Sequence, residues 1–291
     1  MVLGRVTAIV PSRNERFLCS TVNDLLAKAR GDLELIVVCE GYWEHGLPAD
    51  PRLKILHHGR AKGMRPAINA AVQMATGQYL LKSDAHCLWA EGYDETLKAD
   101  YHEDNWILTC RRYALDPEAW SIDESNPRKY PIDYHYLSYP YTGEATAGLH
   151  GTEWRKRRDE RPHVLLDDEM SSQGSGWFMS RGHWDRLGPL ESAKYGNFQH
   201  EFQELGLKTW LGGGAVKVTK RTHYAHLFKG QRYGRGYSLG RDGHRQGSEF
   251  CTRFWMGDEW PQRVRDMRWL IEKFNPPGWP LDLDAVFRRA A

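Results

Sequence analysis

The sequence predicts an α/β fold built on a Rossmann-like, mainly parallel sheet flanked by helices, with a long insertion and a helical extension at the C-terminus. Two observations support this fold class. Apolar, β-branched runs of strand length alternate with segments of helical periodicity over the first 85 residues. Such alternation is typical of parallel strands joined by crossover helices that cover the sheet. Hydrophobic residues make up 41% of the chain, which is enough for a buried core.

The first strands and helices follow one another in a regular order. The run RVTAIV, closed by Pro11, predicts a buried strand, and residues 15–30 then carry apolar side chains at helical spacing. Residues 33–38 and 52–56 predict two more strands, and residues 63–75 predict a second helix with one apolar face. The run QYLLKS predicts the strand that follows this helix.

The second half of the chain is less regular. Residues 106–114 predict another strand, whereas residues 115–173 lose periodicity and are predicted to form a long insertion. Order returns with GSGWFM, a helix over 198–211 and a strand over 215–219. Residues 248–273 predict one amphipathic helix before NPPGWP ends it.

This pattern divides the chain into two parts. We expect a main domain over residues 1–240, which contains the insertion, and a helical extension over 241–291 that packs on it.

Composition excludes several classes of protein. The formal net charge is only +2, which argues against a general polyanion binder. No stretch approaches eighteen apolar residues, and the N-terminal apolar run is too short for a signal sequence, so we expect no membrane span or anchor. The five cysteines form no CxxC pair, which argues against a disulfide framework or a structural zinc site. A cytoplasmic protein is expected, and the sequence leaves its oligomeric state open.

A carboxylate and an imidazole follow the strand QYLLKS. Asp84 and His86 are two residues apart at the point where this strand passes into a loop. Ligands of parallel α/β sheets bind at the carboxyl ends of the strands. An oxygen and a nitrogen at this position can coordinate a divalent cation, although the spacing alone is also common in loops without a metal.

Four longer segments, the first of which contains Asp84 and His86, make the pattern specific. The segment GMRPAINAAVQMATGQYLLKSDAHC resembles the helix and DxH block of the polypeptide N-acetylgalactosaminyltransferases, which have the GT-A fold, and more loosely of family 2 glycosyltransferases. The segment QHEFQELGLKTWLGGGAVKVTKRTHYAH resembles the block that ends at the third metal ligand of the same family. GSGWFM and TRFWMGDEW resemble flanking elements. The resemblance covers about residues 5–110 and 174–260, and it implies a nucleotide-sugar glycosyltransferase whose GT-A catalytic domain is the part over 1–240.

The resemblance implies a site as well as a fold. Asp84, His86 and His226 would bind Mn²⁺ or Mg²⁺, and Glu201 would contact the sugar. The donor is expected to be a nucleotide sugar, and specifically a UDP-sugar. Residues expected to bind it are Pro11, Arg13, Glu40, Arg65, Asp84, Lys229, Arg232 and Tyr233; Arg235 lies in the same basic loop. Glu40 stands near the place of paired aspartates that hold the uridine in the family, and Phe202 replaces an asparagine, so the sugar selectivity does not carry over.

The stereochemistry is an expectation of the same resemblance. The Glu201 block resembles a retaining family, in which no strong base is needed beside the acceptor. An inverting reaction would instead require a base for the acceptor hydroxyl, and Asp168, Glu169, His200 or Glu201 could supply it. The catalytic candidates are therefore Glu201, His200 and Asp168.

The acceptor stays open at this level. It is expected to carry a hydroxyl group. Residues 217–268 contain twelve Lys or Arg against five Asp or Glu, which leaves room for a polyanionic acceptor such as 5-hydroxymethylpyrimidine in DNA. A third hypothesis is a non-catalytic module that binds carbohydrate or nucleic acid.

Overall fold

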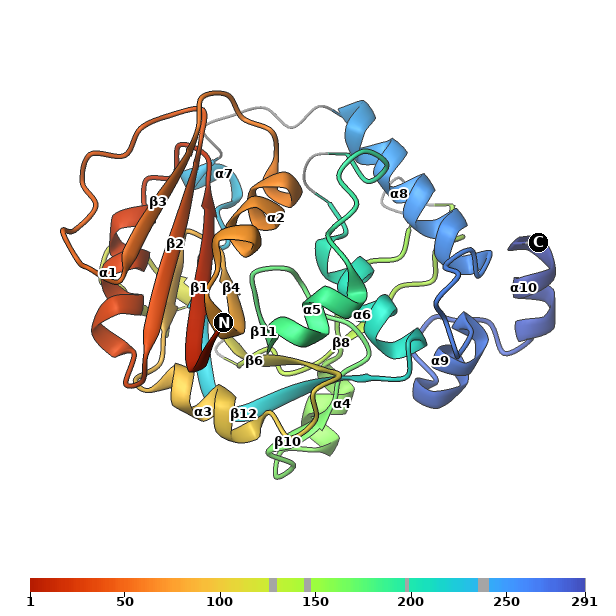
Figure 1. The fold of residues 1–291 in the computed structure, drawn as a ribbon. Helices are drawn as coiled ribbons and strands as arrows, with labels where there is room; N and C mark the ends of the chain where they lie inside the picture. Colours follow the sequence, from red (N-terminus) through yellow and green to blue (C-terminus); the bar gives the residue numbers. More distant parts are fainter. Residues whose placement is uncertain (126–129, 144–147, 197–198, 235–240, 291) are drawn as a thin grey trace.

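A central mixed sheet organises the molecule (Figure 1). The computed structural model describes residues 1–125, 130–143, 148–196, 199–234 and 241–290. The strands are β1 (Val2–Ser12), β2 (Leu33–Glu40), β3 (Leu53–His58), β4 (Gly77–Ser83), β5 (Cys87–Trp89), β6 (Trp106–Asp116), β7 (Ser121–Ile122), β8 (His135–Leu137), β9 (Gly151–Glu153), β10 (Leu166–Asp168), β11 (Gly176–Ser180) and β12 (Ala215–His226). The helices are α1 (Leu18–Lys28), α2 (Met64–Met74), α3 (Tyr93–Asp100), α4 (Arg155–Glu160), α5 (Arg181–Leu187), α6 (Glu201–Leu211), α7 (Gly230–Tyr233), α8 (Arg241–Met256), α9 (Met267–Phe274) and α10 (Leu283–Ala290).

The strand order of the main sheet is β10-β12-β6-β11-β4-β1-β2-β3. β1 pairs in parallel with β2 and β4, β2 with β3, and β6 with β12, whereas β11 runs antiparallel to both β4 and β6. All eight residues of β2 are buried, as expected for a parallel strand covered on both faces. The predicted α/β class with a mainly parallel sheet and flanking helices is confirmed.

The predicted long helix over 248–273 is wrong. The structure has α8 and α9 in its place, separated by residues 257–266. Pro261 lies in this break, where its fixed φ and missing N–H oppose a continuous helix. Asp266 then starts α9 by accepting a hydrogen bond from the backbone N–H of Trp269 at 2.7 Å. α10 follows in what the sequence suggested was a short tail.

The insertion predicted over 115–173 contains more order than its sequence pattern suggests. β8 and β9 form a small antiparallel pair. β10 joins the main sheet, where Leu166 pairs with Thr219 and Asp168 with Lys217 of β12. The proposed division of the chain at 240 and 241 stays a prediction.

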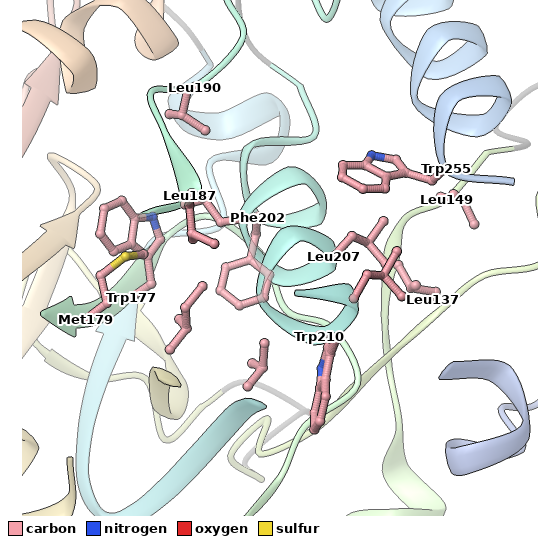
Figure 2. Packing of buried hydrophobic residues seen from close by; sticks show 14 of the residues in the cluster. Leu137, Leu149, Trp177, Met179, Leu187, Leu190, Phe202, Leu207, Trp210 and Trp255 are labelled. Atoms are coloured by element: carbon pink, nitrogen blue, oxygen red, sulfur yellow. The ribbon is translucent and has the colours of Figure 1, made fainter. Parts of the chain in front are cut away.

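α6 occupies the centre of the largest hydrophobic cluster (Figure 2). All eleven of its residues are buried, so this helix is surrounded by protein on every side. Phe202 and Trp210 of α6 pack in a cluster that also includes Trp177 of β11 and Trp255 of α8. The C-terminal helices therefore share one core with the sheet, and the N-terminal end of α6 is held firmly in place. Within the described ranges, no helix has both the length and the apolar character needed to cross a membrane.

Candidate active site

A cavity of about 960 Å³ opens where β1, β4 and β12 end. Its walls come from segments far apart in the sequence, because the sheet brings these three strand ends to the same side. The residues that line it and matter below are Pro11, Arg13, Glu15, Glu40, Lys82, Asp84, His86, His150, Gln173, Gly174, His200, Glu201, His226 and Lys229. The volume is in the range of sites for small ligands and cofactors.

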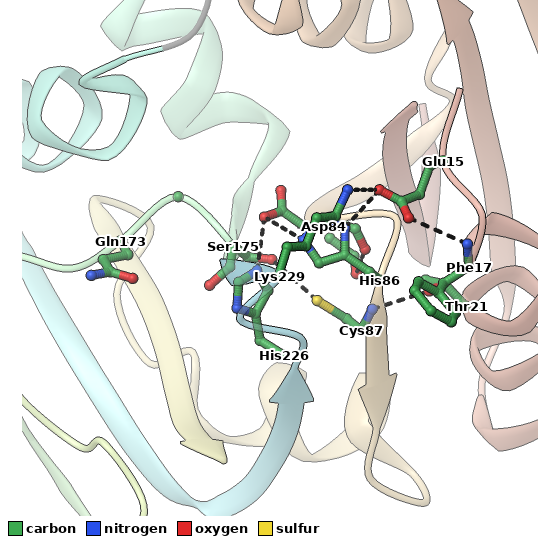
Figure 3. A network of polar contacts seen from close by, with 12 residues as sticks. Glu15, Phe17, Thr21, Asp84, His86, Cys87, Gln173, Ser175, His226 and Lys229 are labelled. Atoms are coloured by element: carbon green, nitrogen blue, oxygen red, sulfur yellow. Dashed lines mark hydrogen bonds and ion pairs between the residues drawn. The ribbon is translucent and has the colours of Figure 1, made fainter. Parts of the chain in front are cut away.

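Asp84, His86 and His226 meet on one wall of this cavity (Figure 3). Asp84 follows the last residue of β4, and His226 is the last residue of β12. β12 pairs with β5 so that His226 lies opposite Cys87, which places it beside His86. Nε2 of His226 is 3.2 Å from Oδ2 of Asp84, and Nε2 of His86 is 3.9 Å from the same oxygen.

These three side chains fit a divalent cation. One ligand atom from each lies within 4.8 Å of the others, and among the residues that the structure describes they form the one such group. Burial lowers the pKa of His226 to about 4, so its ring is neutral near pH 7 and can donate a lone pair to a metal. Burial alone would raise the pKa of Asp84, but the charge of Lys82 and the nearby imidazoles lower it, so the carboxylate is ionised. A carboxylate with two imidazoles suits Mn²⁺.

Two charged side chains hold these ligands from behind. Oε2 of Glu15 accepts a hydrogen bond from Nδ1 of His86 at 3.2 Å, which leaves Nε2 of His86 facing Asp84 (Figure 3). Lys229 also donates to Oε2 of Glu15. Nζ of Lys82 donates to Oδ1 of Asp84 and to the carbonyl oxygen of Gly174. The outer contacts of a metal-binding histidine and carboxylate are thus already formed.

Glu201 is the first residue of α6, and its carboxylate is the second one near Lys82, after that of Asp84. Its Oε1 accepts a hydrogen bond from the indole N–H of Trp177, and its Oε2 lies 3.6 Å from Nζ of Lys82. Burial raises the pKa of Glu201, and the charge of Lys82 opposes that shift. Gly174 packs closely against this carboxylate. A Cβ added at Gly174 would lie 2.8 Å from Oε2 of Glu201, so a larger residue would displace it. The side chain is therefore fixed at the cavity wall.

His200 precedes Glu201 and also lines the cavity. Its backbone has φ of +58°, and Nε2 lies 3.0 Å from Oγ of Ser248. Its ring stacks on His150 with centroids 4.8 Å apart. Burial lowers the pKa of His200 to about 3, so this imidazole is neutral near pH 7. The structure therefore brings His200 and Glu201, two of the three catalytic candidates, to the same cavity.

Four of the predicted donor-binding residues line the cavity beside Asp84: Pro11, Arg13, Glu40 and Lys229. Glu40 is already engaged there. Its Oε2 accepts hydrogen bonds from the backbone N–H groups of Lys62 and Gly63 at 2.7 and 2.6 Å, and its Oε1 pairs with His58. The carboxylate therefore secures the turn that leads into α2, whichever contact it makes with a ligand.

Arg65, predicted to bind the donor, does not line the cavity. Its guanidinium is fully buried, pairs with Glu204, and donates to the carbonyl oxygens of Glu191 and Gln199 at 3.0 and 2.7 Å. It also lies 4.1 Å from the ring centroid of Tyr195. These contacts join α2 to Glu204 of α6 and to the segment 188–200 that precedes α6, so Arg65 supports the site as a structural residue.

Removal of Arg65 is expected to affect stability. The Arg65→Ala variant should lose about 3–5 kcal/mol of unfolding free energy, because the Glu204 carboxylate is then left buried without this partner. Exposed Arg60 offers a control, and Arg60→Ala should change the value by no more than about 0.5 kcal/mol. Chemical denaturation measures both. Equal stabilities for the two variants would contradict a structural role for Arg65.

Arg232 and Tyr233 lie outside the cavity lining. The ring of Tyr233 packs edge-on against Phe17 with centroids 5.8 Å apart, and the guanidinium of Arg232 lies 5.1 Å from the centre of the Tyr233 ring. They lie in the short helix α7, and the cavity-lining residues Gly230 and Gly234 stand on either side of them in the chain. Arg235, predicted with them, is outside the described residues.

Asp168 is also outside the cavity lining. It ends β10 at the edge of the sheet, where it pairs with Lys217 at 2.6 Å and with Lys273 at 2.8 Å. Glu169, the neighbouring base candidate, is buried against His135 and Thr109. Neither carboxylate reaches the cavity. Asp168 ends β10 at the sheet edge, and Glu169, which follows β10, points into the protein interior.

This placement yields a prediction for Asp168. The Asp168→Asn variant should keep its kcat/KM for sugar transfer and lose less than about 1 kcal/mol of stability, because its two ion pairs are partly exposed. Steady-state kinetics beside a denaturation curve gives both values. A large fall in kcat without a loss of stability would restore Asp168 as a catalytic candidate.

Sequence reasoning missed three residues that the structure places at the site. Lys82 is the one charged residue of β4 and directly follows the buried Leu80 and Leu81, which was the available signal. Glu15 follows β1 by three residues, near a strand end. Gln173 accepts a hydrogen bond from Arg112 through Oε1 at 2.7 Å, and no sequence pattern indicated this.

Comparisons with known proteins agree with this geometry. The model of the family described as glycosyl transferase family 2 matches residues 7–182, more than half of the chain. Polypeptide N-acetylgalactosaminyltransferase 5 of Caenorhabditis elegans is 24% identical over 246 residues, which is 78% of this chain and 37% of that protein. The chain therefore spans just over a third of that relative's length.

Solved structures share the fold. A crystal structure of GalNAc-T7 with UDP, GalNAc and Mn²⁺ superposes with a TM-score of 0.69 at 14% identity, covering 93% of this chain and 56% of that one. TarS 1-349 of S. aureus in complex with UDP-GlcNAc superposes with a TM-score of 0.57 at 14% identity, over 91% of this chain and 69% of that one. These matches confirm the predicted GT-A fold.

Proposed function

The chain belongs to glycosyl transferase family 2, and on this premise we propose that it transfers a sugar from a nucleoside diphosphate sugar to an acceptor hydroxyl with the help of a divalent cation, Mn²⁺ or Mg²⁺. One observation carries the proposal. Asp84, His86 and His226 converge at 4.8 Å or less in a cavity that also contains Glu201. This is an arrangement for a metal-bound diphosphate next to a sugar-contacting carboxylate.

The chain's own residues would hold the donor along the cavity. Pro11, Arg13 and Glu40 lie on the part of the wall at the carboxyl ends of β1 and β2, where a nucleoside would fit. Lys229 stands beside the metal ligands and supplies a positive charge for diphosphate oxygens. When bound, the cation would neutralise the negative charge that develops on the leaving diphosphate.

We propose UDP as the nucleotide and retention as the stereochemical course. Both crystal structures compared above contain UDP or a UDP-sugar. Retention is supported by the surroundings of the base candidates. Asp168 and Glu169 do not line the cavity, and Glu201 is held between Trp177 and Lys82. His200 lines the cavity, but its Nε2 is engaged with Oγ of Ser248 and its ring is stacked on His150. A reaction that needs no strong base beside the acceptor suits this arrangement.

The acceptor is proposed only as a hydroxyl compound. A hydroxymethylated base in DNA, suggested by the basic stretch over 217–268, belongs in the same assay as peptide and glycan acceptors. The cytoplasmic location expected from the sequence stays a prediction.

A donor screen tests the proposal. The protein is incubated with UDP-, GDP- and other nucleotide sugars, with Mn²⁺, Mg²⁺ or a chelator, and release of the nucleoside diphosphate is measured with and without acceptors. We expect release from a UDP-sugar that requires the cation, with an α-linked product from an α-linked donor. Intact donors under every condition, together with carbohydrate or DNA binding, would favour the non-catalytic module.

A further inference from the structure

Lys82 is an unusual residue for the interior of a strand. It lies in β4, its side chain is 0% exposed, and it still lines the active-site cavity through its end group. Lysine is almost never fully buried unless its charge is paired. Nζ of Lys82 has two carboxylates near it, Asp84 on one side and Glu201 at 3.6 Å on the other.

The two oxygens of Asp84 have different partners. Oδ1 accepts from Lys82, whereas Oδ2 faces His226 at 3.2 Å and His86 at 3.9 Å. A cation bound by the two imidazoles would therefore share Asp84 with Lys82, one on each oxygen. Two positive charges on one carboxylate repel each other, and the low polarity of a buried site strengthens that repulsion.

A second lysine repeats the arrangement. Glu15, which accepts from His86, is paired with Lys229. Asp84 and Glu15, the two carboxylates that contact the imidazoles, are thus each paired with a lysine, and Glu201 shares Lys82 with Asp84. The positive charges of Lys82 and Lys229 offset most of the negative charge that a free divalent cation would meet, whereas a nucleoside diphosphate would bring further negative charge.

We propose that Lys82 is the resident counter-cation of the Asp84–Glu201 pair, and that it keeps the affinity for a free divalent cation low so that the cation binds tightly only together with a nucleoside diphosphate. This inference rests on the proposed function, because it assumes that Asp84, His86 and His226 bind a metal. It assigns Lys82 as a positioning residue that acts through Asp84 and touches neither sugar nor acceptor.

Mn²⁺ titrations followed by electron paramagnetic resonance test it on the full chain, with and without UDP. The wild type should bind Mn²⁺ weakly alone and at least about tenfold more tightly with UDP. Lys82→Met should bind Mn²⁺ alone about tenfold more tightly than the wild type, with a smaller gain from UDP, because one repelling charge is gone. Lys82→Arg keeps the charge and should behave like the wild type. Equal or weaker Mn²⁺ binding by Lys82→Met would overturn the inference.

Thermal unfolding separates this role from simple support of the fold. Lys82→Met leaves two buried carboxylates without their cation, so its melting temperature should be lower than that of the wild type in chelator and should rise more on addition of Mn²⁺.

If Lys82→Met does not fold, Mn²⁺ titration of Glu201→Gln tests the role of Lys82 instead. This substitution leaves the whole charge of Lys82 on Asp84, so Mn²⁺ alone should bind several-fold more weakly than to the wild type; unchanged or tighter binding would contradict the role of Lys82.

His226→Ala distinguishes the two levels of the argument. If the wild type binds no Mn²⁺ even with UDP, or if His226→Ala binds it equally well, the proposed metal site itself is wrong. If binding to the wild type depends on His226 and UDP but Lys82→Met gains no affinity, only the inference about Lys82 fails.

Discussion

The His226→Ala variant is expected to lose about 10²–10³-fold in kcat/KM for sugar transfer from a nucleotide sugar. His226 is the last residue of β12 and the proposed ligand that would join the C-terminal half of the chain to Asp84 and His86. Without it the proposed site would have two protein ligands, Asp84 and His86, and would hold the cation that neutralises the leaving diphosphate less well. Steady-state kinetics over a range of Mn²⁺ concentrations measures the loss.

His223 offers a matched control on the same strand. It is three residues from His226, so its side chain leaves the opposite face of β12, where its ring packs edge-on against Tyr113 at 5.3 Å. It does not line the cavity. His223→Ala should keep Mn²⁺-dependent transfer close to the wild-type rate. Full activity of His226→Ala at the same Mn²⁺ concentration would remove the metal from the proposed mechanism.

Glu201→Gln is expected to lower kcat by about 10²-fold while the KM for the donor changes little. The amide keeps the shape of the side chain, and its oxygen can still accept from Trp177. It removes a negative charge fixed at the cavity wall, which is placed to stabilise positive charge that develops on the sugar as its bond to the diphosphate breaks.

The effect of Glu201→Gln on stability separates chemistry from folding. Burial opposes the charge of Glu201, so the neutral amide costs the fold little, and Lys82 keeps Asp84 as its partner. Exposed Glu249 serves as a control, because within the described part of the chain its ion pair is a surface contact with Arg245 at 3.4 Å. Wild-type kcat in Glu201→Gln, with Glu249→Gln also unchanged, would exclude Glu201 from the reaction.

Much of the fold follows from local pattern. α1, α2, β1 to β4 and β6 lie where periodicity and β-branched runs predict them. The long helix over 248–273 failed because its apolar periodicity continues across Pro261, where the backbone cannot. β10 was missed because three residues of a sheet edge carry too little pattern to be recognised.

The site shows a similar division. Asp84 and His86 are two residues apart in the sequence and could be proposed from a strand end. His226 was found only by resemblance, since the register that pairs it with Cys87 of β5 is a property of the folded sheet. Arg65 was predicted to bind the donor, but its orientation on α2 brings its guanidinium into contact with Glu204.

Lys82 and Asp168 show in two ways what local sequence cannot predict: the first was missed at the site, and the second was wrongly placed there. Lys82 looks like an interruption of a strand, and only its contacts with Asp84 and Glu201 reveal its place at the site. Asp168 looks like a base beside another carboxylate, and only the pairing of β10 with β12 takes it to Lys217. In both cases tertiary contacts decide what local sequence leaves open.

A single Mn²⁺ ion is expected in crystals grown with Mn²⁺ and UDP, located by anomalous scattering at the manganese edge. It should be coordinated by Oδ2 of Asp84, Nε2 of His86 and Nε2 of His226, with the remaining positions facing the diphosphate. A UDP-bound crystal with the manganese signal elsewhere, or with none beside these three residues, would contradict the proposed metal-dependent transfer.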